Sequence, residues 1–88
     1  MRKYKFYEDP GHGWLEVPRV DIAEVGQEGS VSNFSYQLDD NVYLEEDCDM
    51  SFFLRALEVA EIKYEIENIP QEDSPIREYE RYRMSVIL

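Results

Sequence analysis

Residues 41–57, NVYLEEDCDMSFFLRAL, join a strand-like run, VYLEE, to an apolar run through four carboxylates and the only cysteine. The apolar run has the i, i+3, i+4, i+7 spacing of a single helix face. Its members are Met50, Phe53, Leu54 and Leu57. The pattern predicts a strand followed by an amphipathic helix over about residues 50–61.

The acidic residues before this helix exceed what a helix start needs. Asp49 or Ser51 is placed to cap the helix by accepting hydrogen bonds from free backbone N–H groups. Anions near a helix N-terminus are also favoured by the helix dipole. One cap uses only one or two carboxylates. We therefore predict that Asp49 serves the helix start and that Glu45, Glu46 and Asp47 contribute chiefly to partner binding.

Outward from this stretch, the chain alternates between short strands and turns. KYKFYE and WLEVP read as strands on either side of the turn-forming segment DPGHG. FSYQ and VYLEE read as a hairpin around LDDN, and KYEIENI is a further alternating strand. Short helices are predicted near residues 18–25, with Val20, Ala23 and Ile22 inward, and near residues 75–82, where Ser-Pro fits a helix start.

These elements predict an α+β fold in a single domain over residues 1–88. We expect a small antiparallel sheet of four to five strands, with the main helix packed on one face. The predicted core consists of Tyr4, Phe6, Trp14, Leu15 or Val17, Phe34, Tyr36, Val42, Leu44, Phe53, Leu54, Leu57, Tyr64 and Ile66.

Length and composition exclude several classes of protein. A chain of 88 residues has room for one core, and 43% hydrophobic residues are enough to form it. One cysteine cannot form an internal disulfide. The N-terminus has no apolar signal-peptide region, and no stretch approaches the roughly 20 apolar residues of a membrane span. We expect a cytoplasmic protein that does not bind membranes.

The charge is strongly negative and unevenly distributed. The chain carries a net charge of −11, and residues 8–76 contain 18 acidic and three basic residues, a net −15. Direct binding to nucleic acid needs a basic surface, so it is disfavoured. The sign favours a basic protein partner instead.

The residues for metal binding or catalysis are too few. Zinc sites use three or four Cys and His ligands, whereas this chain has only Cys48 and His12. The acidic stretch lacks the central glycine of a calcium-binding EF-hand loop. Neighbouring carboxylates should raise the thiol pKa of Cys48, which opposes a nucleophilic role. We predict no catalytic residue, metal or cofactor, and a protein that is not an enzyme.

Two surfaces are candidates for partner binding. Asp39 and Asp40 are expected to cluster with the acidic residues 45–47 at one end of the hairpin. In the C-terminal segment, Tyr79 and Tyr82 share a face at helical spacing, where they either complete the core or form a contact surface. The final SVIL, residues 85–88, is either an edge strand or an apolar end that favours a dimer, so we expect a monomer or a homodimer.

The segments YEDPGHGWLEV, FSYQ, VYLEEDCDMSFFLRA and DSPIREYERY resemble a family of small acidic proteins of unknown function from phages, plasmids and other bacterial mobile elements. The resemblance covers residues 4–82 and carries no functional residue with it. It implies an accessory protein acting inside a bacterial host. Proteins of this kind are often inhibitors of host defence, of anti-CRISPR or anti-restriction type, and several imitate the charge of nucleic acid. The alternatives are a phage accessory or assembly protein, or a binding module without such mimicry.

Overall fold

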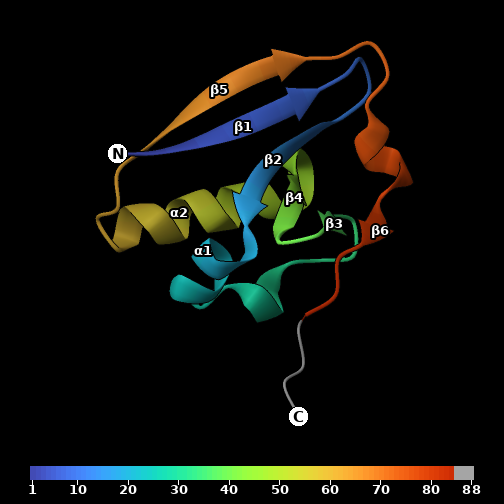
Figure 1. Ribbon diagram of the computed structural model, residues 1–88. Helices are drawn as coiled ribbons and strands as arrows, with labels where there is room; N and C mark the ends of the chain where they lie inside the picture. The colour runs from blue at the N-terminus through green and yellow to red at the C-terminus, as the bar shows by residue number, and fades with distance from the viewer. Residues whose placement is uncertain (85–88) are drawn as a thin grey trace.

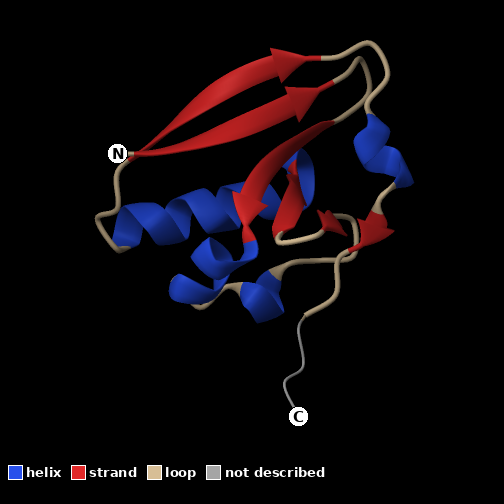
Figure 2. Cartoon of the chain, viewed as in Figure 1, coloured by secondary structure: helices blue, strands red, loops and turns tan. Residues whose placement is uncertain are grey.

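The computed structural model describes residues 1–84, which contain a six-stranded sheet and one main helix (Figures 1 and 2). The strand order is β5-β1-β2-β4-β3-β6. The α+β class is confirmed, with six strands in place of the predicted four to five. The strands are β1 Arg2–Glu8, β2 Gly13–Pro18, β3 Tyr36–Leu38, β4 Asn41–Glu45, β5 Tyr64–Pro70 and β6 Glu80–Arg81.

The sheet is mixed, so the prediction of a purely antiparallel sheet was wrong. β1 pairs with β5 in parallel, whereas every other neighbouring pair is antiparallel. β4 leads into the main helix, which returns the chain to the start of the sheet, so β5 runs in the same direction as β4 and β1. A helical crossover is the usual way to connect parallel strands.

The helical segments are α1 Arg19–Glu24, η1 Glu28–Ser30, η2 Glu46–Met50, α2 Ser51–Val59 and η3 Pro75–Glu78. The predicted main helix is therefore α2, but it follows directly on η2, a π-helical turn that contains the acidic residues. Within residues 1–84, no helix is long and apolar enough to cross a membrane.

The helix predicted over residues 75–82 was wrong beyond its first turn. Ser74 accepts a hydrogen bond from the backbone N–H of Ile76 at the start of η3, as the Ser-Pro signal suggested. The chain then becomes extended, because β6 pairs with β3 and thereby satisfies its backbone groups within the sheet. The prediction for residues 85–88 falls outside the part of the chain that the structure describes.

Apolar side chains are buried on both faces of the sheet. On one face, α2 covers the main core, where the rings of Tyr4 and Phe53 meet edge-on with centroids 5.6 Å apart. The other face carries a smaller aromatic cluster under η3, made of Trp14, Tyr36, Tyr43 and Ile76. The central strand β2 thus buries consecutive side chains on opposite faces.

Two core predictions need correction, those for Phe34 and for the inward face of α1. Phe34 is 59% exposed, because it precedes β3 and lies outside the sheet. In α1, Ile22 is the buried residue, whereas Val20 and Ala23 are exposed. Leu15 and Val17 were alternatives in the prediction, and both are fully buried.

Candidate functional site

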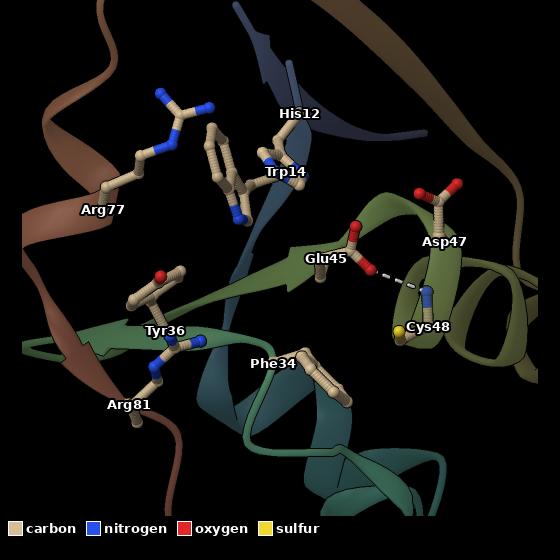
Figure 3. Close-up of a pocket in the computed structure, with 9 residues that line it drawn as sticks. All are labelled: His12, Trp14, Phe34, Tyr36, Glu45, Asp47, Cys48, Arg77 and Arg81. Atoms are coloured by element: carbon tan, nitrogen blue, oxygen red, sulfur yellow. Dashed lines mark hydrogen bonds between the residues drawn. The ribbon is translucent and has the colours of Figure 1, made fainter.

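A pocket of about 350 Å³ lies on the sheet face opposite α2, between the C-terminal segment and the start of the η2–α2 helical run (Figure 3). Its aromatic walls are Trp14, Phe34 and Tyr36. Arg77 and Arg81 reach it from the C-terminal segment. A volume of 300–1,000 Å³ is typical of ligand sites, so this pocket is at the small end of that range.

Both arginines are stacked against the aromatic walls. The guanidinium of Arg77 lies 5.3 Å from the centre of the Trp14 ring, and that of Arg81 lies 4.6 Å from the centre of the Tyr36 ring. Such contacts are attractive because the ring face carries partial negative charge. They also restrict the arginine side chains, so positive charge is held at one wall.

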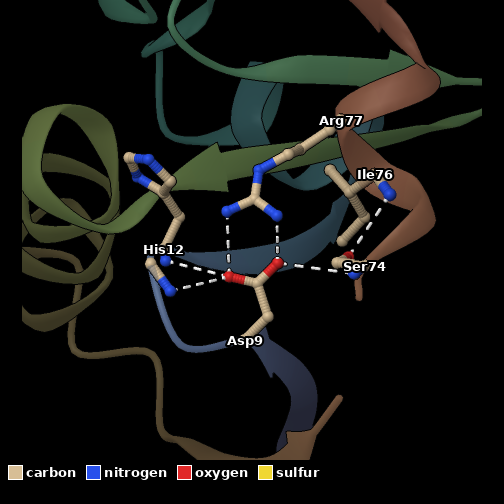
Figure 4. Close-up of polar contacts among 6 residues, drawn as sticks. Asp9, His12, Ser74, Ile76 and Arg77 are labelled. Carbon is tan, nitrogen blue, oxygen red and sulfur yellow. Dashed lines mark hydrogen bonds and ion pairs between the residues drawn. The ribbon is translucent and has the colours of Figure 1, made fainter. Parts of the chain in front are cut away.

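Asp9 holds Arg77 in this position (Figure 4). Its carboxylate accepts hydrogen bonds from both terminal nitrogens of Arg77 and from the backbone N–H groups of Gly11, His12 and Ser74. Burial raises the pKa of this carboxyl, but the hydrogen bonds outweigh burial and lower the pKa to about 2. Asp9 was not among the predicted site residues, although Asp-Pro-Gly is a known signal for a turn closed by an aspartate side chain.

The opposite wall of the pocket is acidic. Glu45 is 8% exposed, and its Oε2 accepts a hydrogen bond from the backbone N of Cys48 at 2.8 Å. Asp47 is exposed and lines the same wall. The pKa of the Cys48 thiol is raised, first by a hydrogen bond to Glu45, then by burial and by the nearby negative charges. The direction of that shift agrees with the sequence prediction.

The prediction that Asp49 caps the helix was wrong, and Glu45, predicted to contribute chiefly to partner binding, has the capping role. Glu45 is the residue that caps the helical run, because the run begins at Glu46 and not after Asp49. Asp49 is 4% exposed and accepts hydrogen bonds from the backbone N of Ser32, the hydroxyl of Ser32 and the hydroxyl of Ser35. Ser35 in turn accepts a hydrogen bond from the backbone N of Glu45. Asp49 thus anchors the loop before β3 to the helix.

The predicted acidic cluster is divided by a strand. Asp39 and Asp40 form the turn between β3 and β4, whereas Glu45 ends β4 beside Trp14. Five strand residues span about 16 Å at about 3.3 Å per residue. The expectation that Asp39 and Asp40 join residues 45–47 was therefore wrong, since the hairpin turn and the helix start lie at opposite ends of β4.

Other acidic residues, and not Asp39 and Asp40, lie at the end of the sheet where β4 leads into the helix. We call this end the acidic end of the sheet. In the sheet, Trp14 of β2 pairs with Glu45 on one side and with Tyr7 on the other. The end of β4 is therefore aligned with the end of β1. Residues 71–74 return to the same end, where Gln71 N donates to the carbonyl of Glu8. Five exposed carboxylates thereby gather there, those of Glu8, Glu46, Asp47, Glu72 and Asp73.

The two tyrosines named from the sequence lie elsewhere. Tyr82 is 6% exposed in the main core, and its hydroxyl donates to the carbonyl of Glu28 at 2.7 Å. Tyr79 is half-buried, with its ring centre 5.1 Å from that of Tyr43. Neither lines the pocket.

No three His, Cys, Asp or Glu side chains within residues 1–84 are arranged to hold a metal ion. Comparison of the chain with protein-family models, with curated proteins and with solved structures gave no match. The family resemblance of the sequence therefore stays a prediction.

Proposed function

We propose that the protein is a non-enzymatic interaction protein of a phage or other mobile element, and that its acidic end binds a basic host protein. The observation that supports this is the group of five exposed carboxylates at the acidic end. None of the five forms an ion pair with another described residue. Their charge is therefore available to a partner.

Four of the nine basic residues, Arg2, Lys3, Arg77 and Arg83, form ion pairs within the fold. Arg2 pairs with Asp21 and Glu24, and Arg77 pairs with Asp9. The acidic end consequently keeps its net negative charge. A concentration of like charge on one side of a small protein accelerates encounter with an oppositely charged surface and discriminates against acidic partners.

The partner class that we propose is a nucleic-acid-binding protein of the host defence. Such proteins carry basic surfaces that neutralise phosphates. A rigid group of carboxylates can occupy such a surface and exclude the nucleic acid. The protein would then act as an inhibitor of anti-CRISPR or anti-restriction type.

The test compares capture of host proteins by the parent protein and by two charge variants. Glu46→Gln, Glu72→Gln and Asp73→Asn together remove three of the four acidic-end charges that lie outside the pocket, and Glu8 is left unchanged. Asp39→Asn, Asp40→Asn and Glu61→Gln make the same charge change at the other end of the sheet. We expect the parent and the second variant to capture the same nucleic-acid-binding protein, in a salt-sensitive manner, and the first variant to lose it.

A captured protein should also bind its nucleic acid less tightly when the parent is added. Equal capture by both variants would contradict the proposal, because it would show that general charge and not the acidic end is recognised. Capture limited to phage structural proteins would also contradict it.

A second candidate function, in assembly, is favoured by the exposed side of α2. Phe52 and Val59 are 61% and 74% exposed and line a groove of about 470 Å³ between α1 and α2. Exposed apolar surface of this kind often marks a protein contact. Analytical sedimentation over a range of concentrations tests this candidate by measuring the oligomeric state. The parent should self-associate, and Phe52→Ser should stay monomeric.

A further inference from the structure

The indole N–H of Trp14 is a buried donor that has no acceptor among the described residues. The side chain is 2% exposed, and Nε1 forms no hydrogen bond within residues 1–84. In Figure 3, this nitrogen lies on the side of the ring that faces the pocket, towards Tyr36 and Glu45. A buried donor without an acceptor is unfavourable. The pocket therefore offers a position for an acceptor that belongs to another molecule.

The charges around the pocket add a second requirement. Asp9 neutralises Arg77 through two hydrogen bonds. Arg81 donates to the carbonyl of Asn33 and forms no ion pair with a described residue. Glu45 and Asp47 place two negative charges on the opposite wall. The balance of these groups is one negative charge, so a ligand with one positive charge would neutralise the site.

The aromatic walls limit how a ligand can lie. The arginines already occupy a face of Trp14 and of Tyr36, which disfavours stacking of a nucleobase between the two rings. Phe34 is 59% exposed at the pocket and has no such contact. Its ring is available to the aliphatic part of a side chain, which lysine and arginine both carry.

We propose that the pocket receives one lysine or arginine residue of the partner protein. The cationic group lies against Glu45 and Asp47, and a backbone carbonyl of the same peptide accepts the hydrogen bond of Trp14 Nε1. This inference rests on the proposed function, since it names the residue of the basic partner that anchors the complex. Charge-assisted hydrogen bonds in a partly buried site give both strength and selectivity.

The chain has a single tryptophan, which makes the test direct. A proton–nitrogen correlation spectrum of the labelled protein contains one indole resonance, that of Trp14. We would titrate it with Gly-Lys-Gly blocked at both ends, and with the same peptide containing norleucine in place of lysine. The expected result is a saturable downfield shift with the lysine peptide, and binding weaker by about tenfold or more with norleucine because the charged hydrogen bonds are lost.

A matched pair of variants identifies the wall that binds the cation. The double variant Glu45→Gln, Asp47→Asn should bind the lysine peptide about tenfold more weakly than the parent, as expected for loss of charge-assisted hydrogen bonds. Glutamine at position 45 still offers an oxygen to the Cys48 N–H, so the helix cap is kept. Asp39→Asn with Asp40→Asn makes the same charge change at the other end of β4 and should leave the affinity unchanged.

Three results would overturn the inference. They are an indole resonance that does not move up to the solubility limit of the lysine peptide, equal binding of the norleucine peptide, or preferred binding of the blocked peptide Gly-Glu-Gly. The variant with changes at Glu46, Glu72 and Asp73 separates this inference from the proposed function, because none of those residues lines the pocket. If that variant still binds the lysine peptide but the parent captures no basic host protein, the proposed function fails and the pocket assignment stands.

Discussion

Asp9 and Arg77 form an ion pair across 68 positions of sequence, with the Asp9 side chain only 1% exposed. The pair joins the β1–β2 turn to η3, so it fixes the C-terminal segment over the aromatic face of the sheet. It also sets the position of the Arg77 guanidinium against Trp14. One buried carboxylate thereby organises both the fold and a wall of the pocket.

Stability should fall in acid partly because of Asp9. Its folded-state pKa is lowered to about 2, below the value of about 3.9 in an unfolded chain. A group whose pKa is lowered by folding contributes stability that is fully present above its unfolded pKa and is lost as pH falls through its folded pKa. We expect the melting temperature of Asp9→Asn to be lower than that of the parent at neutral pH.

The same variant should show a shallower decline in melting temperature between about pH 4 and pH 2, the window that the two Asp9 pKa values define. Thermal melts monitored by circular dichroism at several pH values measure both effects. A variant with the same acid dependence as the parent would show that Asp9 is not a main source of it.

Asp49 should contribute more to folding than a helix cap does. Asp49→Ala removes the acceptor of two serine hydroxyls and one backbone N–H in a buried site, and should cost about 2–4 kcal/mol of unfolding free energy. The exposed neighbour provides the control, since Asp47→Ala should change stability by less than about 0.5 kcal/mol. Urea unfolding of the two variants distinguishes them, and equal losses would contradict the assignment of Asp49 to this network.

The phase of α2 can be checked with two adjacent phenylalanines. Phe53 is 2% exposed in the main core, whereas Phe52 is 61% exposed. Phe53→Ala should cost about 3–5 kcal/mol of unfolding free energy, and Phe52→Ala less than about 1 kcal/mol. Denaturant unfolding measures both values, and a loss below 1 kcal/mol for Phe53→Ala would show that the helix is rotated from the described position.

Cys48 should react slowly with thiol reagents, because its raised pKa keeps the thiol protonated near neutral pH. Glu45→Gln should accelerate the reaction, because Glu45 raises the thiol pKa through its hydrogen bond and its negative charge, and glutamine lacks that charge. Asp47→Asn should have a smaller effect, because the charge of Asp47 contributes least to the raised pKa of the thiol. Alkylation rates at pH 7–9 provide the comparison, and a larger effect of Asp47→Asn would contradict it.

Most of the local structure could be predicted from short stretches of sequence. Alternating residues predicted β1 and β5, a hairpin pattern predicted β3 and β4, and DPGHG predicted the turn between β1 and β2, because strand periodicity and turn chemistry are local properties. The spacing of Phe53 and Leu57 predicted the buried face of α2 for the same reason. The acidic composition also indicated a surplus of carboxylates, although not where they gather.

Which segments lie beside one another could not be predicted in the same way, because it depends on the packing of the whole chain. Alternation shows that a strand has a buried face, but it does not identify the neighbouring strand, so the parallel pairing of β1 with β5 and the short β6 could not be read from the chain. The ion pair of Asp9 with Arg77 depends on the course of the whole chain, as does the position of Trp14 in the pocket. Asp49 is the clearest case. An aspartate beside a helix start matches the sequence pattern of a helix cap, yet this one accepts hydrogen bonds from a loop 17 residues away. Local sequence sets the conformation of a segment, whereas the partner of a buried polar group is chosen by packing.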